Sequence, residues 1–211
     1  MGKNKRYIKP VSDTMDKQNT YREWIGRYNK AIRYEFYYEA ILIDYALLED
    51  RLRSFLYYLG ALYDRNSYKA NKGSAIPYLR KIVAEYKQDE ERDGLNVSNI
   101  SGKRKIIRAV LRWTTNVTGL TKEQKYLWTL KNQCESLDIG EINNQFKKME
   151  EWCAYRNEII HALMNKNVLS VNQELKDRAL EGMEIARYFD SQLKILKKGN
   201  KIRKSANLPE K

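Results

Sequence analysis

Residues 21–63 contain no proline and only two glycines, which constrains the fold more than any other feature of this sequence. Between Ile41 and Leu62, apolar residues recur every three or four positions, the spacing of one helix face. The face is formed by Ile41, Tyr45, Leu48, Leu52, Phe55, Leu59 and Leu62. Further apolar residues at positions 42, 43, 47 and 56 lie on its other side. We therefore expect a central helix that is covered on more than one side.

The rest of the chain also favours helices. The whole chain of 211 residues has only 3 prolines and 10 glycines, and no segment alternates long enough to form a sheet. A second helix is expected after Asn66-Ser67, ending before Gly94. Residues 94–102 read as a loop. The sequence thus predicts an all-α fold.

Further helices are predicted in the second half of the chain. A basic helix starts at about Lys103, and capping boxes at Thr121–Gln124 and Ser170–Gln173 predict two helix starts. Between these boxes, a helical pattern runs from position 142 to about 164. A closing helix is expected from about 171 to 196. At the ends, we expect a flexible basic arm (1–18) and a basic disordered tail (199–211) around a single domain (19–198).

Charge indicates the class of partner. The chain has 40 Lys and Arg against 27 Asp and Glu, a net charge of +13, and 16 tyrosines that can stack on bases. This composition favours a nucleic acid as a partner. No membrane span or signal pattern is present, and the cysteines, Cys134 and Cys153, predict no disulfide framework, so we expect a cytoplasmic protein. No metal-ligand grouping, phosphate-binding loop or dinucleotide motif occurs, so no metal or cofactor is expected.

An arginine stripe marks the basic helix. Arg104, Arg108 and Arg112 recur every four residues, and Ile106 and Val110 lie roughly opposite them. A solvated helix face is one interpretation, and contact with RNA phosphates is the other.

Residues 156–161 read RNEIIH and contain the only histidine of the chain. Histidine is suited to exchange a proton near neutral pH, and the arginine fork is suited to hold a phosphate. Arg156 and His161 are two of the three groups that an RNA-cleaving site needs. The third is the 2′-hydroxyl of a ribose, which the RNA itself would supply. On a helical wheel, Arg156 lies within the apolar arc, whereas Asn157 and His161 share a stripe at its polar edge.

Two other interpretations remain for these residues. Arg156 can be neutralised by an acid on the central helix, for which Asp44 is a candidate, and His161 can be a structural side chain. Because Arg156 and His161 point in different directions on one helix, a second copy related by a two-fold axis is an attractive way to complete a site.

The motif resembles the RX4–6H signature of the HEPN superfamily, including the Asn that follows the Arg. Upstream, residues 48–56 (LEDRLRSFL) resemble a second HEPN helix of the form LExxLRxxL. The resemblance covers roughly residues 35–198 and implies a HEPN-like helical bundle. The segment from about residue 65 to residue 135 would then be an insert of additional helices.

The resemblance also implies a function: a metal-independent endoribonuclease working at a homodimer interface through the motif helix. Arg156 would hold the scissile phosphate, His161 would act as general base or acid, and Asn157 would orient the phosphate or the imidazole. Glu49 matches the acid of the upstream helix and would support Arg156, a role for which Asp44 is the other candidate. Attack by the 2′-oxygen would leave a 2′,3′-cyclic phosphate and a 5′-hydroxyl.

HEPN proteins include bacterial toxins and anti-phage abortive-infection proteins. The resemblance therefore implies a toxin or defence effector of a bacterium or phage, with an antitoxin or regulatory protein as a possible partner. The alternative is a non-catalytic helical module for nucleic-acid binding or assembly, in which the arginine stripe binds RNA.

Overall fold

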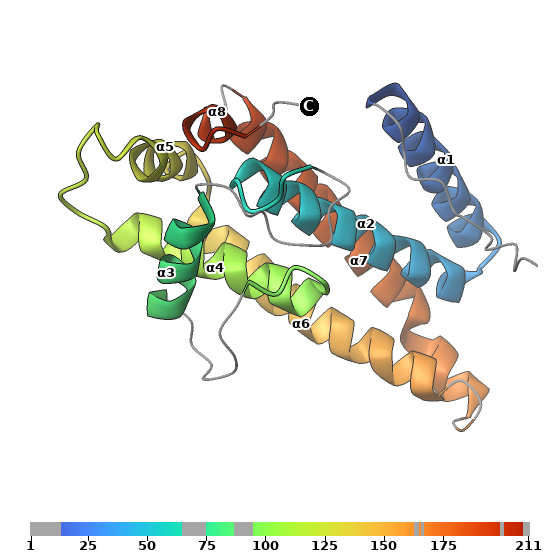
Figure 1. Ribbon diagram of the computed structural model, residues 1–211. Helices are drawn as coiled ribbons and strands as arrows, with labels where there is room; N and C mark the ends of the chain where they lie inside the picture. Colours follow the sequence, from blue (N-terminus) through green and yellow to red (C-terminus); the bar gives the residue numbers. More distant parts are fainter. Residues whose placement is uncertain are drawn as a thin grey trace, which may run out of the picture.

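The computed structural model describes residues 14–64, 75–86, 95–162, 165, 167–198 and 201–208, and all regular elements in these ranges are helices (Figure 1). They are α1 (Thr14–Arg33), α2 (Tyr37–Tyr58), α3 (Ala75–Tyr86), α4 (Ile100–Asn116), α5 (Lys125–Cys134), α6 (Ile139–Ala162), α7 (Val168–Lys197) and α8 (Ile202–Ser205). The predicted all-α fold is confirmed.

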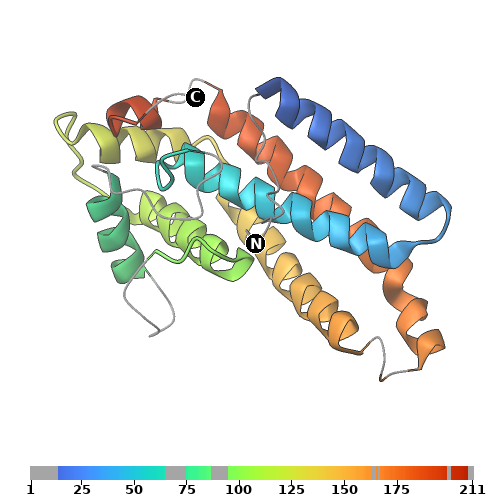
Figure 2. The ribbon, with the colours of Figure 1, turned by 45° about the vertical axis from the view of Figure 1, so that its right-hand side comes forward.

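Helix α2 lies in the interior of the bundle, where it packs along α7 and also contacts α1 and α4 (Figures 1 and 2). Its predicted apolar face is buried except at Tyr45, which is half-buried, although the helix ends at Tyr58 and the buried Leu59 and Leu62 lie in the turn that follows. On the other side Ile43, Leu47 and Leu56 are buried, whereas Leu42 is exposed. The helix is therefore covered on more than one side, as predicted.

The chain turns between α1 and α2, at residues 34–36, where the sequence predicts no break. Glu35 has a φ of 62°, in the left-handed region that glycine usually occupies. The N–H of Phe36 donates to the carbonyl of Ala31 at 2.8 Å and closes the end of α1. Because a residue other than glycine makes this turn, composition does not indicate it.

The N-terminal prediction is partly wrong. Helix α1 begins at Thr14, so residues 14–18 of the expected arm are helical. Residues 1–13 of that arm lie outside the described residues.

The C-terminal prediction is wrong for residues 201–208, which pack on the bundle and include α8. Arg203 is buried there and donates hydrogen bonds to the carbonyl oxygens of Tyr57, Leu62 and Tyr63, at 2.9, 2.9 and 2.5 Å. Carbonyl groups at a helix C-terminus lack partners within the helix. Arg203 supplies donors for Leu62 and Tyr63, and a second donor for Tyr57, whose carbonyl also accepts from the Gly60 N–H at 3.0 Å.

Three helices, α3, α4 and α5, lie within the expected insert of about 65–135. Helix α4 begins earlier than predicted, because the side chain of Asn99 accepts a hydrogen bond from the Gly102 N–H at 2.7 Å and caps it. Helix α5 begins later than predicted, at Lys125. The Gln124 side chain accepts from the N–H of Thr121 at 3.1 Å, which is one of the two bonds of the predicted capping box, but this bond closes a turn that precedes the helix. The motif helix is α6, and it packs between α4 and α7.

Candidate functional site

Trp152 holds the motif helix against the rest of the bundle. Its side chain is fully buried, and its indole N–H donates to the carbonyl of Arg178 on α7 at 2.7 Å. Gly182 on α7 makes room for the ring, since a Cβ there would lie 2.7 Å from Trp152 Cζ2. Ile159, further along α6, is also buried. The segment that carries Arg156 is therefore fixed by packing on both sides.

Arg156 is half-buried, and its guanidinium lies over the ring of Tyr45 on α2, with Cζ 4.1 Å from the ring centroid. Its Nη1 donates to Oδ1 of Asn157 at 3.0 Å. The Nε atom is buried and has no hydrogen-bond partner among the described residues. No ion pair joins Arg156 to an acid in the described part of the chain. An aromatic ring and an amide stabilise this cation but do not neutralise it.

The pairing of Arg156 with Asp44 is not formed. Asp44 is fully buried on another side of α2, where its Oδ2 would lie 2.8 Å from a Cβ at Gly182. Neither of its carboxylate oxygens has a hydrogen-bond partner among the described residues. Burial raises the pKa of Asp44 to about 8, and the charge of Arg187 opposes this rise. Consecutive residues point about 100° apart on a helix, so Tyr45 faces α6 while Asp44 faces α7.

Glu49 does not contact Arg156 either. It accepts a hydrogen bond from Nζ of Lys103 at 3.0 Å and forms an ion pair with Arg53 at 3.1 Å. The Lys103 side chain is buried, and burial lowers its pKa while Glu49 acts in the opposite direction. The carboxylate therefore supports the packing of α4 on α2. It can support Arg156 only indirectly, through Tyr45, which lies one turn earlier on α2.

Asn157 and His161 are both exposed and lie one turn apart, as the helical wheel predicts. No hydrogen bond of His161 occurs within the described part of the chain. Arg156 and His161 are five residues apart, which places them about 140° from each other around an ideal helix. The monomer therefore presents the arginine and the histidine on different sides of α6.

The arginine stripe of α4 is only partly exposed. Arg104 is buried, forms an ion pair with Glu150 on α6 and donates to the carbonyl of Phe146 at 3.4 Å. Arg108 is half-buried and Arg112 is exposed. The prediction that Arg104 belongs to a solvated or RNA-contacting stripe is wrong. The buried arc of α4 is wider than its apolar pattern suggested, because the helix contacts α2, α3, α5 and α6.

A cleft of about 370 Å³ opens beside the motif, between α2, the first turn of α4 and α6. Its lining consists of Tyr45, Asn99, Ile100, Ser101, Arg104, Met149, Glu150, Cys153, Ala154 and Asn157. Burial raises the pKa of the Cys153 thiol to about 11, and the charges of Arg104 and Arg156 oppose this rise. Both guanidinium groups thus lie near the same wall. Sequence reasoning missed Tyr45, Ser101 and Glu150 as site residues, since no local pattern connects the three helices.

A larger groove of about 780 Å³ lies between α1 and α2, and no residue of the Arg–His motif lines it. Its lining is mainly apolar and includes the exposed side chains of Trp24, Tyr34, Phe36 and Leu42. Among the described residues, none of the exposed large apolar side chains lies on α6. The exposed surface of the motif helix is therefore polar.

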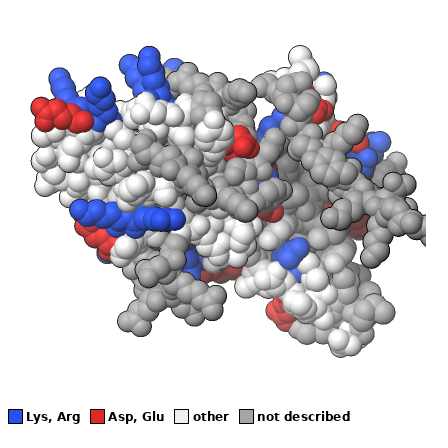
Figure 3. Space-filling view, in the orientation of Figure 1, with Lys and Arg blue, Asp and Glu red and all other residues white. Residues whose placement is uncertain are grey.

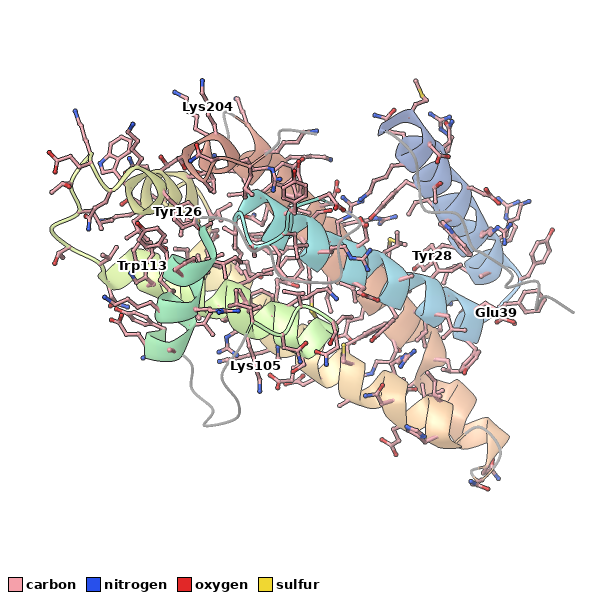
Figure 4. All side chains as sticks on the ribbon, viewed as in Figure 1. Tyr28, Glu39, Lys105, Trp113, Tyr126 and Lys204 are labelled. Atoms are coloured by element: carbon pink, nitrogen blue, oxygen red, sulfur yellow. The ribbon has the colours of Figure 1, made fainter. Side chains whose placement is uncertain are left out.

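Basic side chains are distributed over several parts of the surface. On the face shown in Figure 3, one group of Lys and Arg lies at the upper left, over α5 and α8, and others stand apart from it. Lys105 and Lys204 project from opposite edges of the molecule (Figure 4). The net charge alone therefore does not identify one binding site for an anion.

Within the ranges that the structure covers, no group of His, Cys, Asp and Glu side chains is arranged to hold a metal ion, and no helix is long and apolar enough to cross a membrane. Comparisons with protein-family models, with curated proteins and with solved structures give no significant match.

Proposed function

We propose that this protein is a metal-independent endoribonuclease of the HEPN type, which cleaves RNA at a composite site of a homodimer and acts as a prokaryotic or phage toxin or anti-phage effector. The observation that carries the proposal is the state of Arg156. It is a half-buried guanidinium that no acid neutralises in the described part of the chain, and the only histidine lies on the same helix. A phosphate would supply the anion that this cation lacks.

Each motif residue has a role in this proposal. Arg156 holds the scissile phosphate and stabilises the negative charge that grows on it as the 2′-oxygen attacks. His161 takes the proton of the 2′-hydroxyl or gives one to the departing 5′-oxygen. Asn157, which already accepts a hydrogen bond from Arg156, keeps the guanidinium in place. DNA lacks the 2′-hydroxyl, so it would bind without being cut.

The helical geometry supports the homodimer in this proposal. Arg156 and His161 lie on different sides of α6, so one copy does not readily bring both groups to one phosphate. A two-fold axis beside α6 would place the arginine of one copy near the histidine of the other. Because the exposed surface of α6 is polar, such an interface would depend on hydrogen bonds and charge pairs more than on apolar burial.

The first test is cleavage of mixed cellular RNA by the wild-type protein and His161→Ala in excess EDTA. The expected result is cleavage by the wild type alone, with 2′,3′-cyclic phosphate ends, while His161→Ala keeps its affinity for RNA. Cleavage that stops when metal is removed, or that persists in His161→Ala, would contradict the mechanism.

The second test addresses the composite site. Arg156→Ala and His161→Ala are each expected to be inactive, but their mixture is expected to regain about a quarter of wild-type activity. Random exchange makes about half of the dimers mixed, and each mixed dimer has one intact site of two. If both groups came from the same copy, the mixture would remain inactive.

The alternative function is non-catalytic RNA binding through the arginine stripe. It is less well supported, because Arg104 is buried and paired with Glu150 instead of being exposed to a ligand. Binding of RNA without any cleavage in the first test would favour this alternative.

A further inference from the structure

We infer that the cleft between α2, α4 and α6 is a binding site for one nucleotide of the RNA strand, the one next to the scissile phosphate. The inference rests on the proposed ribonuclease function, because that function supplies the strand. The site itself follows from the shape, lining and charge of the cleft, which lies beside Arg156 but does not include His161.

The shape of the cleft suits a small ligand. A volume of about 370 Å³ lies at the lower end of the range found for small-molecule sites. Helices α4 and α6, which supply most of the lining of the cleft, contact each other. A protein helix would need a longer groove, such as the apolar one between α1 and α2.

The lining offers hydrogen bonds as well as an aromatic ring. Ser101 contributes a hydroxyl, Asn99 and Asn157 contribute amides, and Tyr45 contributes a ring. Bases of single-stranded RNA are recognised by this combination of stacking and edge contacts.

The charge of the cleft favours a phosphate. Glu150 is the acid of the lining, and its pKa is lowered by a hydrogen bond from Arg104 and by the charges of Arg104, Arg108 and Lys105. One carboxylate thus faces three cations, and Arg156 adds a fourth beyond Cys153. The half-buried side chains of Lys105 and Arg108 are the cations of this group that a phosphate can reach from solvent, because Arg104 is buried behind Glu150.

The position of the cleft connects it to the motif. Asn157 lines the cleft and bonds to Arg156, and Tyr45 lines the cleft and lies under Arg156. A strand whose scissile phosphate lies on Arg156 therefore has its neighbouring nucleotide at the mouth of the cleft. The base of that nucleotide would enter between α4 and α6, and its phosphate would lie near the positive charges that surround Glu150.

The first arm of the experiment changes charge without removing a buried cation. Glu150→Gln keeps an oxygen that can accept from Arg104 but removes the negative charge that opposes a phosphate. Glu151→Gln is the matched control, because Glu151 is an exposed neighbour on α6 that does not line the cleft. Affinity is measured by fluorescence anisotropy with a short single-stranded oligoribonucleotide of mixed sequence, in the His161→Ala background so that the RNA stays intact. We expect Glu150→Gln to bind about fivefold more tightly than Glu151→Gln.

The second arm fills the cleft. Ser101 is exposed on the first turn of α4, so Ser101→Trp obstructs the cleft without entering the core. Thr115→Trp, at the exposed far end of the same helix, is the control. We expect Ser101→Trp to weaken RNA binding about tenfold, the effect of losing the contacts of one base, while Thr115→Trp leaves it unchanged.

The outcomes separate this inference from the proposed function. Equal affinities for the two Gln variants, together with no effect of Ser101→Trp, would overturn the nucleotide site even if the wild type cleaves RNA. The expected pattern in a protein whose wild type never cleaves RNA would support a nucleotide-binding cleft and overturn the ribonuclease.

Discussion

Replacing Asp44 with Asn is expected to remove a pH-dependent loss of stability. The carboxyl of Asp44 is fully buried, has no hydrogen-bond partner among the described residues and has a pKa of about 8 in the folded protein. In the unfolded chain its pKa returns to its usual value of 3.8. Between these two values, the unfolded state releases a proton that the folded state retains. The contribution of Asp44 to the free energy of unfolding is therefore highest below about pH 4, and it falls as the pH rises toward 8.

The magnitude follows from proton linkage. In that window the free energy of unfolding falls by about 1.4 kcal/mol for each pH unit, which gives about 4 kcal/mol between pH 5 and pH 8. The charged groups nearest to Asp44 act in known directions: Arg187 on α7 lowers its pKa, while Tyr28 on α1 has its own pKa raised by burial and by Asp44. Asn has nearly the same shape but no charge to bury, so the variant lacks this contribution.

The assay is urea denaturation of the wild type and Asp44→Asn at a series of pH values from 5 to 9. The difference between the two stabilities is expected to be small at pH 5 and to grow in favour of the variant up to about pH 8. Glu39→Gln, which changes an exposed acid on the same helix, is expected to leave the profile of the wild type unchanged. Parallel profiles for the wild type and Asp44→Asn would refute the reasoning, because they would show that Asp44 has the same pKa in both states.

Two further substitutions test the packing around the motif helix and the C-terminal segment. Gly182→Ala is expected to destabilise the fold by about 2–3 kcal/mol, because its Cβ would lie 2.7 Å from Trp152 Cζ2 and 2.8 Å from Asp44 Oδ2. Gly26→Ala, which has no neighbour within 4 Å, is expected to stabilise α1 by about 0.5–1 kcal/mol, and thermal unfolding of both variants compares them. Arg203→Met is expected to cost about 3 kcal/mol in urea denaturation, since the carbonyl groups of Leu62 and Tyr63 lose the Arg203 donor and that of Tyr57 keeps only the Gly60 N–H. Lys204→Met at an exposed neighbour is expected to have no effect. A wild-type midpoint for Arg203→Met would show that α8 contributes little to the stability of the bundle.

Helical periodicity predicted the central helix well, because its pattern is local and strong. The burial of Leu48, Leu52 and Phe55 follows directly from their spacing. The break at Glu35 does not, because nothing in the composition of residues 34–36 indicates a left-handed turn. Periodicity therefore identified the elements better than it placed their ends.

The errors at charged residues have a different origin. Arg104 and Arg203 are buried because acceptors that are distant in the sequence receive their hydrogen bonds, Glu150 in one case and the carbonyls after α2 in the other. A single sequence does not show these long-range partners. Asp44 is the opposite case: its position among apolar residues suggested a buried partner, and the structure provides none among the described residues.

The candidate site was predictable only in part. The spacing of Arg156, Asn157 and His161 gave their distribution around α6, including the exposure of the last two. Tyr45 was identified as one member of an apolar face, and its place under the guanidinium of Arg156 depends on how α2 packs against α6. The cleft could not be predicted, because its walls come from three helices.

The anchoring of α6 by Trp152 and Ile159 divides the proposed site into a rigid half and an adjustable half. Arg156 lies between these two buried side chains and over Tyr45, so its position is determined by the folding of the monomer. His161 comes after Ile159, is exposed and forms no hydrogen bond within the described residues. A molecule that covers this end of α6, whether a second copy or an inhibitor, could therefore reposition the imidazole without disturbing Arg156. In the proposed site, folding of the monomer would place Arg156, and assembly with a second molecule would place His161 and so control the activity.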